Sequence, residues 1–168
     1  MTKIVSDKIN AMNKKTGEIS SLLILPLLGV VMYEVILRYV FNAPTIWGFE
    51  LTIFLYGIHF VLGYSYTDCL NGHVRVDVLT AKMSVRSRAI MDSITLIVIF
   101  FPVMICLVIW TSKFAITSAG MLELNSTSWA PPIYPIKILM AIGFLLVLLQ
   151  GISHLISNIN IILGKETT

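Results

Sequence analysis

The fold is decided by residues 33–51, YEVILRYVFNAPTIWGFEL, in which two oily segments meet at a short turn. Within that turn, Asn42 and Pro44 are residue types that interrupt helices, so the flanking segments are expected to form separate helices. A connection this short between two helices makes them antiparallel neighbours. We therefore predict a helical hairpin, with one helix over 19–41 and the next over 47–67.

Three charged side chains flank the turn. Glu34 and Arg38 are four residues apart with the acid first, which is the favourable order for an ion pair on one helix face. Arg38 and Glu50 are equally far from Pro44, at a depth of roughly 9 Å below the turn for a rise of about 1.5 Å per residue. We expect Arg38 to bridge Glu34 and Glu50 and so to lock the hairpin. The alternative is that the net negative charge of this cluster docks a partner protein.

The composition is that of a membrane protein. The 168 residues are 57% hydrophobic and only 12% charged, whereas a soluble domain has about 25% charged residues. A helix needs roughly 20 mostly apolar residues to cross the hydrocarbon core. Four stretches meet this need, at 19–41, 47–67, 90–112 and 133–158. We predict an all-α integral membrane protein in which residues 1–168 form a single membrane domain with four transmembrane helices.

The distribution of Lys and Arg predicts the orientation, because cytoplasmic segments carry an excess of both. One side of the predicted spans has nine of the 12 basic residues, namely Lys3, Lys8, Lys14, Lys15, Arg75, Lys82, Arg86, Arg88 and Lys165. The other side has Arg38, Lys113 and Lys137. Both termini are therefore expected to be cytoplasmic. Since the basic residues form short clusters beside apolar runs, a nucleic acid is not expected as a partner.

The longest polar segment lies between the second and third predicted spans. Within it, Leu79, Met83 and Ile90 share one side at helical spacing over residues 77–92. This segment is either a short interfacial helix on the cytoplasmic membrane surface or a solvated basic loop that sets the topology.

No pattern in the sequence indicates catalysis. Cys69 and Cys106 are isolated and are expected to be buried, reduced fillers, and His59 is expected to be neutral and hydrogen-bonded to a neighbouring helix. The chain has no Walker, HExxH or GxSxG motif, so neither an enzyme, a cofactor nor a metal site is expected. Without an inverted repeat it is also a poor stand-alone transporter. By elimination, we expect this chain to be an auxiliary subunit of a membrane complex.

Three stretches then point to a family. They are EVILRYVFNAPTIWGFEL at 34–51, LGYSYTDCLNGHVRVDVL at 62–79 and STSWAPPIYPIK at 126–137. Their order and spacing, over about 25–160 of the chain, resemble the small permease subunit of tripartite ATP-independent periplasmic (TRAP) transporters, the DctQ-like family.

The resemblance implies a scaffold role. In this family the small four-helix subunit associates with a large permease subunit, which holds the substrate and sodium sites and moves as an elevator. A periplasmic substrate-binding protein delivers an organic acid, and the sodium gradient drives its import across the bacterial inner membrane. The implied partners are the large permease subunit, the periplasmic binding protein and membrane lipid.

The resemblance also marks family-motif positions. Gly72 suits a tight turn because glycine takes positive φ at little cost, and Arg75 and Asp77 are expected to fix their loop against a helix end or a partner. The prolines stiffen the outer loop at 114–132, which is either a contact surface for the periplasmic protein or a rigid connector. The family-motif positions are Glu34, Arg38, Asn42, Pro44, Trp47, Glu50, Gly72, His73, Arg75, Asp77, Trp129, Pro131, Pro132, Pro135 and Lys137.

Two other functions stay open at this point. The chain is alternatively an independent, homo-oligomeric small channel or exporter, with His59 and the Glu34 cluster lining a pathway. The third reading is a membrane anchor of another complex.

Overall fold

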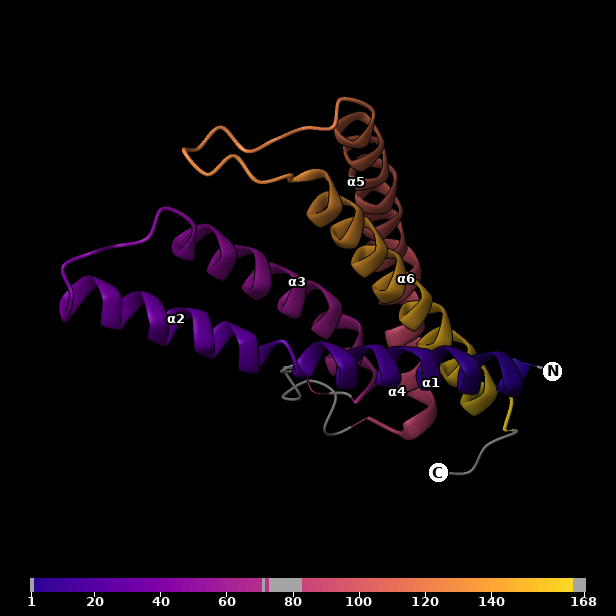
Figure 1. Ribbon diagram of the computed structural model, residues 1–168. Helices are drawn as coiled ribbons and strands as arrows, with labels where there is room; N and C mark the ends of the chain where they lie inside the picture. The colour runs from indigo at the N-terminus through magenta and orange to yellow at the C-terminus, as the bar shows by residue number, and fades with distance from the viewer. Residues whose placement is uncertain (1, 71, 73–82, 165–168) are drawn as a thin grey trace.

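The computed structural model describes residues 2–70, 72 and 83–164, and this part of the chain is helical (Figure 1). Its only β-bridge is an isolated one between Leu124 and Pro132. The all-α prediction is therefore confirmed for the described residues. In chain order the elements are α1 (Thr2–Ser21), α2 (Ile24–Tyr39), α3 (Gly48–Cys69), α4 (Val85–Thr95), the π-helical turn η1 (Leu96–Phe100), α5 (Phe101–Gly120) and α6 (Tyr134–Ile162).

Helices α1 and α2 follow one another almost in line, with a short interruption at Leu22 and Leu23 (Figure 1). The interruption is explained by Pro26, which has no N–H to donate to the Leu22 carbonyl and whose ring would collide with it. The lysine-containing segment before residue 19, which precedes the first predicted span, is itself helical.

The third long helix runs without a break from Val85 to Gly120 through α4, η1 and α5. It begins at Ser84, whose side chain accepts a hydrogen bond from the Ser87 N–H at 3.2 Å, as an N-cap residue does. The π turn lies just before Pro102, which cannot donate to the Val98 carbonyl, and the Phe101 N–H bonds to Leu96 instead.

The predicted interfacial helix at 77–92 is not formed as a separate element over its described part. Residues 85–92 are the first turns of the long helix that leads into α5, because no residue that breaks a helix stands between them and Pro102. Residues 77–82 lie outside the described part of the chain, as do the family-motif positions His73, Arg75 and Asp77.

Two helical hairpins diverge from a common base (Figure 1). One is α2 with α3 and the other is α5 with α6, and at the base α1 and α3 pack against α6. Glycines allow the close approaches there. A Cβ on Gly17 would overlap the Tyr66 ring of α3, and a Cβ on Gly143 would overlap Val61, which is how small residues bring membrane helices together.

Within the described part of the chain, three helical stretches are long and apolar enough to cross a membrane by length and composition, at Ile4–Tyr39, Val85–Gly120 and Tyr134–Ile162. The 22-residue α3 is not among them, since it carries Glu50, His59 and Asp68. Many large apolar side chains are exposed, such as Leu25 at 66% and Ile116 at 72%. A surface this apolar fits lipid or another protein rather than water.

Candidate functional site

The turn between α2 and α3 is held by the carboxylate of Glu34. Its Oε1 accepts a hydrogen bond from Arg38 Nη2 at 2.7 Å, and its Oε2 accepts from both the N–H (3.2 Å) and the hydroxyl of Thr45. The Thr45 hydroxyl in turn accepts from the Gly48 N–H at 3.0 Å, which satisfies a free donor at the start of α3. Glu34 is therefore connected to the beginning of the next helix through one threonine.

Gly48 is required by this arrangement. A Cβ at position 48 would lie against the Thr45 hydroxyl and the Glu34 carboxylate. Glu34 is only 8% exposed, so it has no room to withdraw. Thr45 and Gly48 complete the site, and neither was among the candidate residues that the sequence indicated.

Arg38 does not reach Glu50, and the predicted three-residue bridge is not formed. The acid–base pair within α2 is present, whereas Glu50 accepts a hydrogen bond from Asn125 Nδ2 at 3.1 Å. Glu50 is itself buried at the start of α3, and the Arg38 side chain is 50% exposed. Arg38 and Glu50 are the same number of residues from the turn. That number does not determine how each helix is rotated about its axis.

The partner of Glu50 comes from the loop between α5 and α6, residues 121–133, which we call the outer loop after its predicted side. This loop folds back on itself: the Asn125 N–H donates to the Pro131 carbonyl at 2.8 Å, and the Ile133 N–H donates to the Glu123 carbonyl at 3.0 Å. Figure 1 shows the loop extending from the ends of α5 and α6 toward the α2–α3 hairpin. The loop is shorter than the predicted 114–132, because α5 continues to Gly120.

A second ion pair closes the base of the outer loop. Lys137 Nζ, in the first turns of α6, donates to Glu123 Oε2 at 2.5 Å and lies 3.9 Å from the centre of the Phe114 ring. The hydrogen bond from Lys137 holds the pKa of the Glu123 carboxyl below its ordinary value. Glu123 was not among the predicted residues, since its partner lies 14 positions away, beyond the reach of helix periodicity.

The other family-motif residues that the structure describes have local structural roles. Asn42 lies just after the end of α2 and has a φ of 51°, and the next N–H, that of Ala43, bonds back to the Leu37 carbonyl, as in helix ends with a left-handed residue. Trp47 stacks on Tyr33, with 5.8 Å between the ring centres. Of the remaining motif residues, Pro44 follows Asn42 in the turn. Trp129, Pro131 and Pro132 lie in the outer loop, and Pro135 lies in the first turn of α6.

Gly72 follows α3, and its N–H donates to the Thr67 carbonyl at 2.8 Å. Its φ is not in the left-handed region, so the conformational reason that the sequence suggested does not apply. A Cβ there would press on the Thr67 side chain and carbonyl. Close approach, rather than positive φ, accounts for the glycine.

A buried polar network joins α1 to α6, and the sequence reasoning missed it. Asn13 Nδ2 donates to Gln150 Oε1 at 2.7 Å, and Gln150 Nε2 donates to Asn10 Oδ1 at 3.0 Å. Ser153 also donates to Asn10 Oδ1 at 2.9 Å, and it lies 2.6 Å from the Ser6 hydroxyl. Asn13 and Gln150 are at most 1% exposed. The signal in the sequence was a run of small and polar residues at heptad spacing, which reads as a solvated face unless a partner helix is known.

His59 and Cys69 contact α1, and Cys106 lies on α5. His59 Nδ1 donates to the Ser20 carbonyl at 2.9 Å, so the predicted hydrogen bond to a neighbouring helix is confirmed. Cys69 is partly buried, but Cys106 is exposed on α5, where the prediction of a buried residue was wrong. Residue 106 faces outward because Met104 and Ala115 are the residues that α5 buries.

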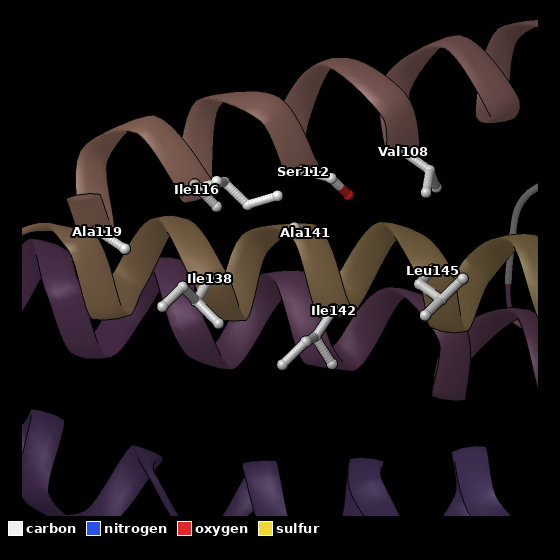
Figure 2. A pocket seen from close by; sticks show the side chains of 9 residues that line it. Val108, Ser112, Ile116, Ala119, Ile138, Ala141, Ile142 and Leu145 are labelled. Carbon is white, nitrogen blue, oxygen red and sulfur yellow. The ribbon is translucent and has the colours of Figure 1, made fainter.

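The contacts among the described residues hold helices together. In residues 2–70, 72 and 83–164, no group of three or more His, Cys, Asp or Glu side chains is placed to hold a metal. A groove of about 280 Å³ lies between α5 and α6, and Figure 2 shows Ser112 as the one polar side chain among its labelled apolar lining.

A model of a known family matches most of the chain. Residues 27–160 match the family model described as the DctQ component of tripartite ATP-independent periplasmic transporters. The match covers well over half of the chain and agrees with the resemblance found in the sequence motifs. No curated protein and no solved structure matches.

Proposed function

Because the chain belongs to the DctQ component family of TRAP transporters, we propose that this small membrane component positions the large permease subunit and contributes no substrate ligand of its own. The proposal includes a bacterial inner-membrane location, cation (sodium)-coupled uptake of an organic acid, and a periplasmic binding protein that delivers it. Two features support it: the polar side chains of α3 have partners within the chain, and one face of α2 is exposed.

We propose that α3 is the fourth span, with both termini cytoplasmic as the Lys and Arg distribution predicts. At about 1.5 Å per residue, its 22 residues reach roughly 33 Å, enough to cross the hydrocarbon core. Its polar side chains have protein partners: Glu50 bonds to Asn125, His59 to Ser20, and Asp68 lies 3.3 Å from His154 Nε2. Polar groups that are paired within the bundle can lie in a membrane.

One exposed face of α2 supports a docking role. Leu28, Val31, Val35 and Arg38 recur every three or four residues and therefore share a face, and all four are exposed. Helix α2 packs mainly against α3, so this face has no large contact within the described chain. Glu34 pairs with one side of the Arg38 guanidinium, and the exposed donors on its other side are costly in a membrane without an acceptor of their own.

This half-exposed Arg38 is the single observation that carries the proposal. Glu34 holds the guanidinium on one side, and Thr45 fixes Glu34, so the charge is presented in a set position. We propose that the large permease subunit packs on this face and supplies an acidic or carbonyl acceptor to the free side of Arg38. The alternative is a staple that only stabilises the hairpin.

A bulky substitution on each of two α2 faces tests the docking face. We expect Val35→Trp to lower the amount of large permease subunit that co-purifies with the tagged chain, because it obstructs the proposed interface. Ile36→Trp is the matched control, since Ile36 is equally exposed, at 44%, but points about 100° away around the helix. Equal recovery of the large subunit with both variants would contradict the proposed face.

Reconstitution of the purified chain alone tests the competing channel or exporter. The scaffold proposal expects no solute flux from vesicles that contain only this chain. Flux that Glu34→Gln or His59→Ala abolishes would contradict it and would support a pathway through this chain instead.

A further inference from the structure

Helix α1 has two faces of opposite character. Its inner face has the residues Ser6, Asn10, Asn13, Gly17 and Ser20, spaced by four and three positions in turn as in a heptad seam. Each of these residues is in contact with another helix: the first three through the α1–α6 network, Gly17 against Tyr66, and the Ser20 carbonyl with His59.

These contacts determine the rotation of α1 about its axis. Buried amides with hydrogen-bond partners cannot turn outward without leaving those partners unsatisfied in a dry contact. Asn13 is fully buried, and it donates both to Gln150 and, at 3.4 Å, to the Leu146 carbonyl. The opposite face of α1 is therefore held outward.

That outer face is a stripe of alternating apolar and basic residues, Ile4, Lys8, Met12, Lys15 and Ile19, which we call the α1 stripe. Their spacing of four or three residues puts them on one side of the helix. All five are exposed, with Ile4 and Ile19 at 60% and Met12 at 40%. No acidic residue lies within the stripe, since Asp7 and Glu18 are on its flank.

The stripe lies at the end of α3. The Asn10 carbonyl accepts from the Cys69 thiol at 3.7 Å, in the last residue of α3, and Gly17 packs on Tyr66 one turn earlier. Lys15 is therefore level with the last turn of α3, and Lys8 lies just beyond the end of α3. If α3 spans the membrane as proposed, this is the depth of the lipid headgroups on one side.

We infer that the α1 stripe binds anionic phospholipid headgroups, with Lys8 and Lys15 on the phosphates and Ile19 against the upper acyl chains. The inference rests on the proposed membrane arrangement and goes beyond the proposed scaffold role. Charge complementarity supports this occupant: two cations stand among exposed apolar side chains, which is the pattern of helices that lie against anionic membrane surfaces. Lysine stems bury along apolar surface while the ammonium group stays at the polar boundary.

Lipid selectivity of the purified full chain tests the inference. The chain is reconstituted in nanodiscs with equal amounts of phosphatidylglycerol and phosphatidylcholine, and the retained lipids are counted by native mass spectrometry after release into detergent. The wild type is expected to retain phosphatidylglycerol preferentially. Lys8→Gln/Lys15→Gln is expected to lower that preference by about fivefold for each lysine removed. The reason is that a lysine near an anionic surface raises the affinity about fivefold.

A matched variant separates position from net charge. Lys14→Gln/Lys113→Gln removes the same charge from two exposed lysines outside the stripe, and it is expected to keep the wild-type lipid preference. An equal loss of preference in both double variants, or no preference in the wild type, would overturn the inference.

Co-purification keeps this test apart from the test of the scaffold role. The stripe variant is expected to recover the large permease subunit in wild-type amounts. If it instead loses that subunit while keeping its phosphatidylglycerol, the stripe is a protein interface and the inference is wrong. If the wild type recovers no large subunit but shows the lipid preference, the scaffold proposal fails and the lipid inference stands.

Discussion

Glu34 and Thr45 are joined twice, because the threonine donates both its backbone N–H and its hydroxyl to one oxygen of the carboxylate. The same hydroxyl accepts from Gly48 at the start of α3. One threonine thus connects the end of one helix to the beginning of the next, and the hairpin does not depend on an ion pair between helices.

We expect Thr45→Val to destabilise the hairpin while Thr45→Ser leaves it nearly unchanged. Valine keeps the shape but removes the hydroxyl, which leaves a buried carboxylate oxygen and a helix N–H without that partner. Thermal unfolding in detergent should show a Tm lower by about 2–6 °C for valine, the scale expected for a lost capping interaction in a chain of this size. A Tm for Thr45→Ser as low as that for Thr45→Val would mean that the hydroxyl is not the important group.

Arg38→Ala should have different effects on the isolated chain and on the complex. Its pair with Glu34 is exposed on one side, and exposed pairs add little stability, so the Tm of the isolated chain should change by no more than about 2 °C. Recovery of the large permease subunit should fall severalfold if Arg38 meets a partner acid. A variant that loses Tm but keeps full recovery would identify Arg38 as a staple alone.

Gln150→Leu should loosen α1 from α6. The substitution removes one of the two hydrogen-bond partners of Asn10 Oδ1 and one of the two partners of Asn13 Nδ2, at a cost of about 0.5–1.5 kcal/mol for each hydrogen bond lost. Limited proteolysis should then cut within α1 sooner than in the wild type. The double variant Asn13→Leu/Gln150→Leu should recover part of the loss, because both partners of one hydrogen bond are replaced. If the two losses simply add, the residues do not act as a pair.

Gly143→Ala should separate α3 from α6, and Gly57→Ala is its control. The new methyl at position 143 would overlap Val61, including its backbone carbonyl, whereas a Cβ at position 57 meets nothing within 4 Å. The Tm should fall for Gly143→Ala and stay equal or rise for Gly57→Ala, since alanine is favoured over glycine in a helix by up to about 1 kcal/mol. Equal shifts for the two variants would contradict the close contact.

Acid should weaken the base of the outer loop. Lys137 lowers the pKa of Glu123, so the folded chain binds a proton on this residue less readily than the unfolded chain. The stabilisation is therefore complete above the ordinary value of 4.5 and is lost as the pH falls below it toward the folded pKa. Melting curves over this range should show a smaller pH dependence for Glu123→Gln than for the wild type. Identical pH dependence in both would show that the pair does not contribute.

Periodicity and motif order predicted the parts that depend on local chemistry. Helix ranges near α2, α3, α5 and α6, the turn at Asn42 and Pro44, and the Glu34–Arg38 pair all follow from residues close together in the chain. The family followed from three motifs in order. The predicted bridge from Arg38 to Glu50 was wrong, because a small error in helix rotation moves a side chain to another neighbour. Glu50 bonds to Asn125 instead.

The sequence by itself determined an all-helical membrane protein of the TRAP small-component family, since oily runs, turn residues and motif spacing are properties of neighbouring positions. Only the tertiary structure decided which polar groups meet: Glu50 with Asn125, Glu123 with Lys137, and Asn13 with Gln150. These contacts join residues that are 75, 14 and 137 positions apart, and their formation depends on how the helices cross and rotate. The same rotation turns the lysines of α1 outward, so a segment that reads as a basic tail becomes a helix with one polar seam inside and one basic stripe outside.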